Sequence, residues 1–430
     1  MIGDNPRIVS AIVGALRFHG SLPEKLSSLS DSEWHELLDY ADLSHLTLSL
    51  GARCSAYLPE WVRDRVSYNQ HDNRVRAGLI QESYREILTA FTTANVQHVV
   101  IKGFAQCPDY APNPQNRFQS DIDLYCPEHE LKRATNVLRQ LEYRSIPTPT
   151  FADHLPVMIR PRGWKWRGNS FDPEMPPSLE LHHRLWNYRA LRFGPTDLGD
   201  FWLRRTMRTT NGLTYPALHP VDNLGFSALQ VLRDLLQFRL AAHKVYELAY
   251  FLNRKTKDRI FWRDWKRTHN EELRYWEAVS FCLADACFGC DLAPELSDEI
   301  AMLPGMIRAW MAKYAQSSLT TYRSSEKNAV WVHAALVSSA QDKLAVLMKM
   351  FPPAPDQEKA IGSIASSSGK PFRTKRFGKY AIYCLQRIPR HTVIIPRTMY
   401  RGVRSLLASR HFPRPALKRS NAAFDFSRSA

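Results

Sequence analysis

Asp121 and Asp123 have the residue type and the spacing that metal-assisted chemistry requires. They lie in the run DIDLY, where polar and apolar residues alternate, and this alternation predicts a half-buried strand. On a strand, both carboxylates project from one face while Ile122 and Leu124 project from the other. The two aspartate Cα atoms would be about 7 Å apart, so the carboxylates can share one or two Mg²⁺ ions. A D-x-D pair arises by chance about once in a chain of this length, so the neighbouring residues decide its meaning.

The residues before this strand form a second candidate element. An apolar run from Val96 to Ile101 predicts a short buried strand that ends at Lys102 and Gly103. Gly103 permits a tight turn and a close approach of the backbone to a triphosphate, because glycine has no Cβ. Lys102 and Arg117 are candidates to neutralise phosphate charge. The alternative is that both are solvated surface charges.

A third element brings another carboxylate. The run 178–186 predicts a strand on which Glu180 and His182 share a face. The run 154–159 predicts a further strand, and we expect the two runs to pair as a hairpin. If this hairpin lies beside 121–125, Glu180 becomes the third carboxylate, as a metal ligand or as the base that activates an acceptor.

These residues also have ordinary structural explanations. Glu180 would fit a simple ion pair with a nearby arginine. His154, His182 and His183 would fit packing or hydrogen-bonding positions. The aromatic and basic run 164–167 would fit either base stacking or an exposed hairpin tip.

Three motifs follow one another along the chain: I-K-G at 101–103, N-R-F-Q-S-D-I-D-L-Y at 116–125 and S-L-E-L-H-H-R-L at 178–185. Over about residues 75–255 the chain resembles the uncharacterised nucleotidyltransferase family of bacteria, within the polymerase-β-like nucleotidyltransferase superfamily. The matching positions are Lys102, Gly103, Arg117, Asp121, Asp123, Glu180 and His182.

Two positions depart from the family pattern. Ser120 stands where a glycine is usual, and Phe104 follows Gly103, which leaves the Gly-Ser phosphate turn incomplete. A predicted helical segment at 246–252 resembles a further family segment, with Glu247 in place of Asp.

The resemblance implies a metal-dependent enzyme that moves an NMP from an NTP to an acceptor and releases pyrophosphate. Mg²⁺ or Mn²⁺ is the implied cofactor, with Asp121, Asp123 and Glu180 as catalytic residues and metal ligands. The nucleotide- and phosphate-binding residues would be Lys102, Gly103, Arg117 and Ser120, with His182 in support. The acceptor would be a small molecule, a peptide or a protein.

The predicted fold class is α+β, with a small mixed β-sheet between N-terminal helices and a C-terminal helical region. Strand signals are confined to about 96–186, and Asp222 is a candidate helix cap. We expect an N-terminal helical region at 1–95, a nucleotidyltransferase core at 96–215, a C-terminal helical domain at 216–362, and a serine-rich linker with a basic tail at 363–430. Helices are predicted at 7–19, 32–50, 61–95, 127–141, 220–255, 271–288, 296–315 and 327–350.

Composition is that of a soluble globular protein, with 44% hydrophobic and 23% charged residues in 430. Because no run of 18 apolar residues and no signal-peptide pattern occurs, a cytoplasmic location is expected. Seven cysteines argue against a disulfide framework. Cys282, Cys287 and Cys290 fit either a zinc or iron–sulfur site or small core residues.

Positive charge is concentrated at the C-terminal end. Residues 370–430 hold fifteen Lys or Arg and one acidic residue, so they carry fourteen of the sixteen net positive charges. This tail is expected to bind an anionic surface, either RNA or lipid. The alternative is that part of it packs on the body through Tyr380, Ile382, Tyr383 and Leu385.

Two hypotheses about function remain from the sequence. The first is the metal-dependent nucleotidyltransferase, which the three carboxylates favour. The second is a non-catalytic binding or regulatory protein on a degenerate nucleotidyltransferase fold, with its basic tail on nucleic acid or an anionic membrane. The sequence contains neither a Walker loop nor a G-x-S-x-G motif, which argues against P-loop and α/β-hydrolase enzymes.

Overall fold

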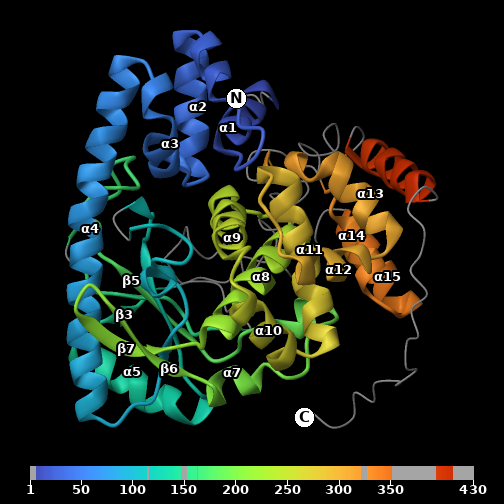
Figure 1. The fold of residues 1–430 in the computed structure, drawn as a ribbon. Coiled ribbons are helices and arrows are strands. Elements are labelled where there is room, and N and C mark those ends of the chain that lie inside the picture. Colours follow the sequence, from blue (N-terminus) through green and yellow to red (C-terminus); the bar gives the residue numbers. More distant parts are fainter. Residues whose placement is uncertain are drawn as a thin grey trace, which may run out of the picture.

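The computed structural model describes residues 6–113, 116–146, 153–161, 163–320, 327–350 and 394–409. It shows a mixed sheet between two sets of helices, which confirms the predicted α+β class (Figure 1). The serine-rich linker and most of the basic tail, including the run 380–385 that was expected to pack on the body, lie outside the described residues.

The N-terminal part of the chain folds into α1 (Pro6–Leu16), α2 (Asp31–Leu43), α3 (Thr47–Cys54) and α4 (Glu60–Thr93), with 3₁₀ turns η1 (Pro23–Ser28) and η2 (Ser55–Tyr57). A capping box starts α2: Ser30 Oγ accepts from the Glu33 N–H, and the Glu33 carboxylate accepts from the Ser30 N–H. The prediction of one helix at 32–50 is wrong. His45 has a φ of 56°, and this left-handed residue ends one helix before the next begins.

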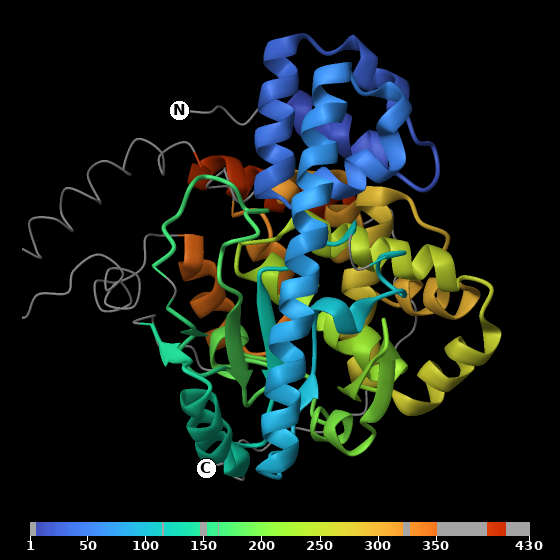
Figure 2. The same ribbon diagram turned by 90° about the vertical axis from the view of Figure 1, so that its left-hand side faces the viewer.

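The helix α4 is a single element of 34 residues, as the breaker-free sequence predicted. Its first half packs Val62 and Val66 into the core of the helical region. Its second half packs Ile80 and Tyr84 into a separate core under the sheet. Figure 2 shows α4 running from the N-terminal helices down across the sheet.

The sheet has seven strands in the order β3-β4-β5-β2-β1-β7-β6. The central pair β2–β5 is parallel, β1 is antiparallel to β2 and parallel to β7, and β4 is antiparallel to β5 as the predicted hairpin requires. The bounds are β1 (Val99–Val100), β2 (Asp121–Tyr125), β3 (Arg144–Ser145), β4 (Met158–Ile159), β5 (Ser178–His182), β6 (Thr206–Thr210) and β7 (Leu213–Ala217).

The two faces of the sheet differ in chemistry. Ile122, Leu124, Leu179 and Leu181 point into the core that α4 and α5 (Leu131–Gln140) cover. Side chains alternate along a strand, so the aspartates of β2 and the glutamate of β5 project from the opposite face. The candidate functional residues are therefore held by strands whose other side is fully packed.

A hairpin of β6 and β7 completes the sheet beyond the region in which strands were expected. The confinement of strand signals to 96–186 is wrong, because the two strands pair from Thr206↔Ala217 to Thr210↔Leu213. Asn211 and Gly212 form the turn with φ values of 51° and 73°. An Asn-Gly pair with both φ values positive is the commonest two-residue hairpin turn, so the signal was present in the sequence.

The C-terminal helices surround α8 (Pro220–Leu236), in which every residue from Val221 to Leu236 is buried. Residues 394–408 form a further helix beside α14 (Figure 1). The other helices are α6 (Tyr188–Leu191), α7 (Gly199–Leu203), α9 (Ala242–Lys255), α10 (Arg259–Thr268), α11 (Glu271–Phe288), α12 (Pro294–Ala301), α13 (Gly305–Tyr314), α14 (Val330–Leu336) and α15 (Ala340–Leu347), with 3₁₀ turns η3 (Gly103–Gln106), η5 (Glu128–Glu130), η6 (Gln316–Thr320) and η7 (Met348–Met350).

The prediction that Asp222 caps α8 is wrong, because this carboxylate takes part in a buried ion-pair cluster. Arg204 donates two hydrogen bonds to it at 2.8 and 3.0 Å. His269, which has no exposed surface, lies 3.2 Å from Asp222 and 2.8 Å from Glu277. Although burial disfavours a charged imidazole, Glu277 and Asp222 raise the pKa of His269 to about 9. The cluster joins α8, α10 and α11.

The cysteines belong to the packing of the helical region. Cys287 and Cys290 are buried in its core, and Cys282 packs against that core with its thiol free. These positions favour small core residues over a metal site. Among the described residues, no helix combines the length and the apolar composition that a membrane span requires.

Candidate metal centre

The parallel pairing of β2 with β5 determines which side chains of the two strands lie next to each other in the site. Asp121 lies opposite Ser178, Asp123 opposite Glu180, and Tyr125 opposite His182. Residues that are two apart share a face of a strand, so the carboxylates and the imidazole converge on one side of the sheet. The hairpin does lie beside 121–125, which was the condition for Glu180 to join the two aspartates.

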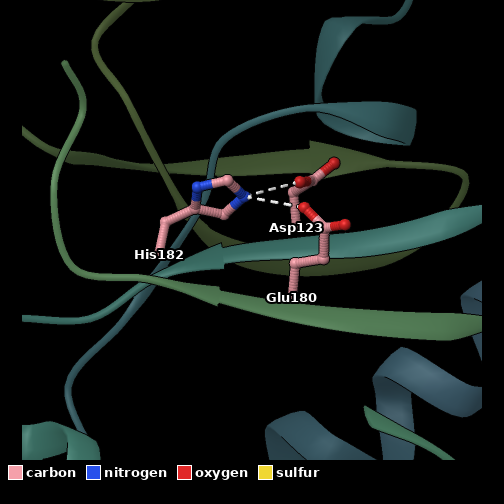
Figure 3. Close-up of side chains that lie close together, drawn as sticks. All are labelled: Asp123, Glu180 and His182. Atoms are coloured by element: carbon pink, nitrogen blue, oxygen red, sulfur yellow. Dashed lines mark hydrogen bonds and ion pairs between the residues drawn. The ribbon is translucent and has the colours of Figure 1, made fainter. Parts of the chain in front are cut away.

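Asp123, Glu180 and His182 form the group on which the two strands converge. Their ligand atoms all lie within 4.8 Å of one another. His182 Nε2 is 2.8 Å from Asp123 Oδ1 and 3.3 Å from Glu180 Oε2, as Figure 3 shows. Asp123 is only 3% exposed, so it is largely shielded from water. Asp121 lies on the same face of β2 but is not part of this compact group.

Lys102 brings positive charge to the carboxylates. It lies two residues beyond the end of β1, and its Nζ lies 2.7 Å from Asp123 Oδ1. Its side chain is mostly buried, so the alternative of a solvated surface charge is wrong. One carboxylate oxygen of Asp123 thus meets both the Lys102 ammonium and the His182 ring.

The charges in the group shift one another's ionisation. Burial alone would raise the pKa of Asp123, but Lys102 and His182 hold it well below its usual range. Burial and Lys102 oppose protonation of His182, yet Asp123 and Glu180 raise its pKa. Burial, together with Asp123 and Glu180, raises the pKa of Asp121 to about 7. Three carboxyl groups thus converge where Lys102 and His182 contact Asp123, and the raised pKa of Asp121 means that a third negative charge is disfavoured there without a further cation.

This excess of carboxylate is the observation that tests the fit of a divalent cation. In the described part of the chain Asp121 has no ion pair within 4.0 Å, although it is half-buried near the carboxylates of Asp123 and Glu180. Carboxylate oxygens are the ligands that Mg²⁺ and Mn²⁺ prefer. Asp123, Glu180 and His182 are close enough together to fit such an ion, and Asp121 lies beside them on the same face of β2.

Among the residues that the structure describes, no arginine pairs with Glu180. Its neighbours are His182 and, at 4.0 Å, His154. The His154 ring lies 2.7 Å from the Leu155 carbonyl oxygen through Nδ1, and His183 faces Glu128 at 3.5 Å. His154 and His183 therefore have structural partners, whereas His182 belongs to the carboxylate group.

Gly103 adopts a backbone conformation that favours glycine. Its φ is 67°, and a Cβ there would lie 2.1 Å from Gln119 Nε2. The Gln119 amide in turn donates to the Asp121 carbonyl at 2.7 Å. Ser120, which replaces the usual glycine, accepts from the Ser178 N–H through its carbonyl oxygen and helps to join β2 to β5. The turn at Gly103 is thus tied to the start of the aspartate strand.

Arg117 lies within the protein rather than at its surface. Its Nη2 donates to Gln106 at 2.7 Å, and its Nε lies 3.0 Å from the Glu247 carboxylate of α9. Gln106 in turn donates to Ser227 of α8. The structure therefore places Arg117 in a link between the loop before β2 and the C-terminal helices. Glu247, the residue that stands for the family's Asp, is its partner.

Arg76 is a residue of the site that the sequence reasoning missed. From the middle of α4, its buried guanidinium donates to four backbone carbonyls: Gln119 at 3.0 Å, Ser120 at 3.1 Å, Asp172 at 3.2 Å and Met175 at 2.8 Å. Two of these carbonyls precede β2, and two precede β5. A single side chain thus ties together the starts of the two strands that carry the carboxylates.

Two further cationic segments lie near the site. Burial and, to a smaller extent, Arg233 of α8 lower the pKa of Lys102, but the nearby carboxylates outweigh them and raise it overall. Arg233 is itself paired with Asp153 at 3.0 Å. In the run 164–167, Trp164 donates to Asp172, and Trp166 is more than half exposed. The exposure of Trp166 agrees with the alternative that the run 164–167 is an exposed hairpin tip.

A family model described as an uncharacterised nucleotidyltransferase matches residues 30–289, which is more than half of the chain. The chain belongs to this family. The match spans α2 to α11 and includes every residue of the site described above. No curated protein and no solved structure matches the chain.

Proposed function

We propose that this member of the nucleotidyltransferase family transfers an NMP from an NTP to an acceptor and releases pyrophosphate, with Mg²⁺ or Mn²⁺ as its cofactor. The observation that carries the proposal is the convergence of Asp123, Glu180 and His182, with Asp121 on the same face of β2. The family assignment indicates the class of reaction, and the carboxylates are the ligands that a metal-dependent reaction of this class requires.

Asp121, Asp123 and Glu180 would hold the metal ion. When bound, such an ion polarises the α-phosphate and neutralises charge on the leaving pyrophosphate. His182 keeps Asp123 and Glu180 oriented through its Nε2, which is the supporting role that a neighbouring donor plays in metal sites.

The protein's own side chains would carry out the remaining steps. An acceptor hydroxyl attacks the α-phosphorus, the bond from that phosphorus to the bridging oxygen breaks, and pyrophosphate leaves with the electron pair. The hydrogen bond from His182 outweighs burial and lowers the pKa of Glu180, so this carboxyl is ionised and can accept the acceptor's proton where it does not serve as the third metal ligand. Lys102, on the strand end beside Asp123, carries the charge that can meet a phosphate.

The turn at Gly103 is the proposed binding site of the triphosphate. Gly103 has a positive φ and begins η3, and a tight turn of this kind can present backbone N–H groups to a phosphate. Ser120 and Arg117 flank this turn, and Arg117 would act there through its link to Gln106. We expect the protein to work in the cytoplasm, with ATP as the first nucleotide to test.

The test combines metal binding with turnover. We expect Mn²⁺ to bind, as measured by electron paramagnetic resonance, and NTP binding to depend on the metal. Pyrophosphate release should stop when EDTA is added. Glu180→Gln should weaken Mn²⁺ binding, whereas the matched change Glu174→Gln, at an exposed glutamate, should not.

Two results would count against the proposal. Failure of wild-type protein to bind Mn²⁺ would remove the metal centre. NTP binding that is unaffected by EDTA, without pyrophosphate release for any of the four NTPs, would instead favour a non-catalytic binding protein on this fold.

A further inference from the structure

The helix at 394–408 is packed with its small residues inward. Thr398, Gly402 and Ser405 are buried, at spacings of four and three residues that place them on one side of the helix. The Trp331 indole of α14 donates to the Thr398 carbonyl at 2.8 Å. A Cβ at Gly402 would lie 2.1 Å from the same indole. The helix therefore packs on α14 with its backbone in close contact with the Trp331 side chain.

Five large apolar residues from Met399 onward point the other way. At 3.6 residues per turn they fall within an arc of about 120°, which makes one continuous stripe along the helix. An ordinary surface helix buries such a stripe, whereas here each member is at least half exposed. The members of this apolar stripe are Met399, Tyr400, Val403, Leu406 and Leu407.

Arginines line one side of the apolar stripe. Arg397, Arg401 and Arg404 occur at spacings of four and three residues, and the helix has no acidic residue. Arg401 also lies over the Tyr314 ring, 5.4 Å from its centre. The surrounding segment 370–430 carries fourteen of the sixteen net positive charges of the chain. The surface that covers this stripe must therefore be both apolar and anionic.

We propose that this helix docks flat on an anionic lipid bilayer, with the apolar stripe in the acyl boundary and the arginines at the headgroups. A bilayer offers both an apolar layer and negative charge, which this combination of side chains requires. Nucleic acid would match the arginines but would leave the aliphatic members of the stripe without a partner. In Figure 1 the helix (red) lies at the edge of the molecule, away from the sheet that carries the metal centre.

The experiment is vesicle co-sedimentation of full-length protein. We expect binding to phosphatidylcholine vesicles that contain phosphatidylglycerol, and at least about tenfold weaker binding to phosphatidylcholine alone. Val403→Ser with Leu406→Ser should reduce binding at least tenfold. Arg397→Gln with Arg404→Gln should do the same and should weaken the dependence on salt. The matched control is Ile260→Ser, which changes a still more exposed apolar residue on α10.

A spectroscopic reading separates insertion from simple charge attraction. Tyr400→Trp should show blue-shifted emission with anionic vesicles, and Ile260→Trp should not. Three results would overturn the proposal: no binding to anionic vesicles, equal loss in the Ile260 control, or a stripe variant that loses RNA binding or self-association but keeps its vesicle binding. None of these readings depends on nucleotidyl transfer.

Discussion

Asp123 and Glu180 are register partners on two parallel strands, and this pairing defines the candidate metal centre. The two residues are far apart in the sequence, and a slip of one residue in either strand would turn one carboxylate to the opposite face. The Arg76 hydrogen bonds at the starts of both strands, and the His182 contacts near their ends, hold this register.

Asp123→Asn should abolish metal-dependent pyrophosphate release while the fold is kept. The change preserves volume but removes the charge that Lys102 and His182 now offset. A loss of about 100-fold or more is expected, which corresponds to about 3 kcal/mol of transition-state stabilisation. Circular dichroism checks the fold, and Asp264→Asn on α10 is the control. Wild-type turnover by the variant would show that Asp123 is not a ligand.

Arg76→Met should destabilise the protein and disturb the site together. It leaves four buried carbonyls without their donor, so the free energy of unfolding should fall by about 3 kcal/mol or more. The stability of Arg76→Lys should lie between those of the wild type and Arg76→Met. An ammonium keeps the positive charge but lacks the planar guanidinium with its several N–H donors. Urea unfolding measures this effect. The control is Arg85→Met, at an exposed position of the same helix, and equal stability of the Arg76 and Arg85 variants would refute the role of Arg76.

Arg117 and Glu247 should be energetically coupled. Each single change, Arg117→Met or Glu247→Gln, leaves a largely buried charge without its partner and should cost about 3 kcal/mol of stability. Changing both residues together should cost less than the sum by at least about 1 kcal/mol, as a double-mutant cycle measures. Additive costs would mean that the charge of Arg117 acts elsewhere, for example on phosphate.

The buried His269 cluster should make stability depend on pH. The folded pKa of about 9 lies above the unfolded value, so the stabilisation is fully present below about pH 6.5 and is lost as the pH rises through 9. The shift corresponds to about 3 kcal/mol for this buried group. We expect the free energy of unfolding to fall between pH 6.5 and 9.5.

The control for this prediction is His269→Gln, which removes the titrating group. The variant should be less stable at pH 6.5, and its stability should change less between pH 6.5 and 9.5. If wild type and variant lose stability in parallel over this range, His269 is not the group responsible.

The strands of the site were predictable because their residues alternate. In DIDLY and in SLELH, each polar side chain is followed by an apolar one, so the face of Asp121, Asp123, Glu180 and His182 could be read directly. The pairing of the two strands could not be read in this way. It depends on a crossover through α5, β3 and β4, and therefore on tertiary packing.

The supporting residues were harder to predict for a physical reason. A buried Arg76 looks like any helix surface arginine in the sequence, because its partners are backbone carbonyls and leave no side-chain signature. Arg117 was singled out as a phosphate residue, but a sequence cannot show that a carboxylate 130 positions away lies beside it. The Asn-Gly turn of the β6–β7 hairpin did carry a signal, which was overlooked.

The continuity of α4 has a mechanical consequence. One unbroken helix contributes Val62 to the core of the N-terminal helices and Tyr84 to the core under the sheet, so those two parts cannot swing about a joint at residue 95. A helix of this length spans about 50 Å and bends only gently. The N-terminal helices and the sheet that carries the carboxylates should therefore keep a fixed position relative to each other when a substrate binds.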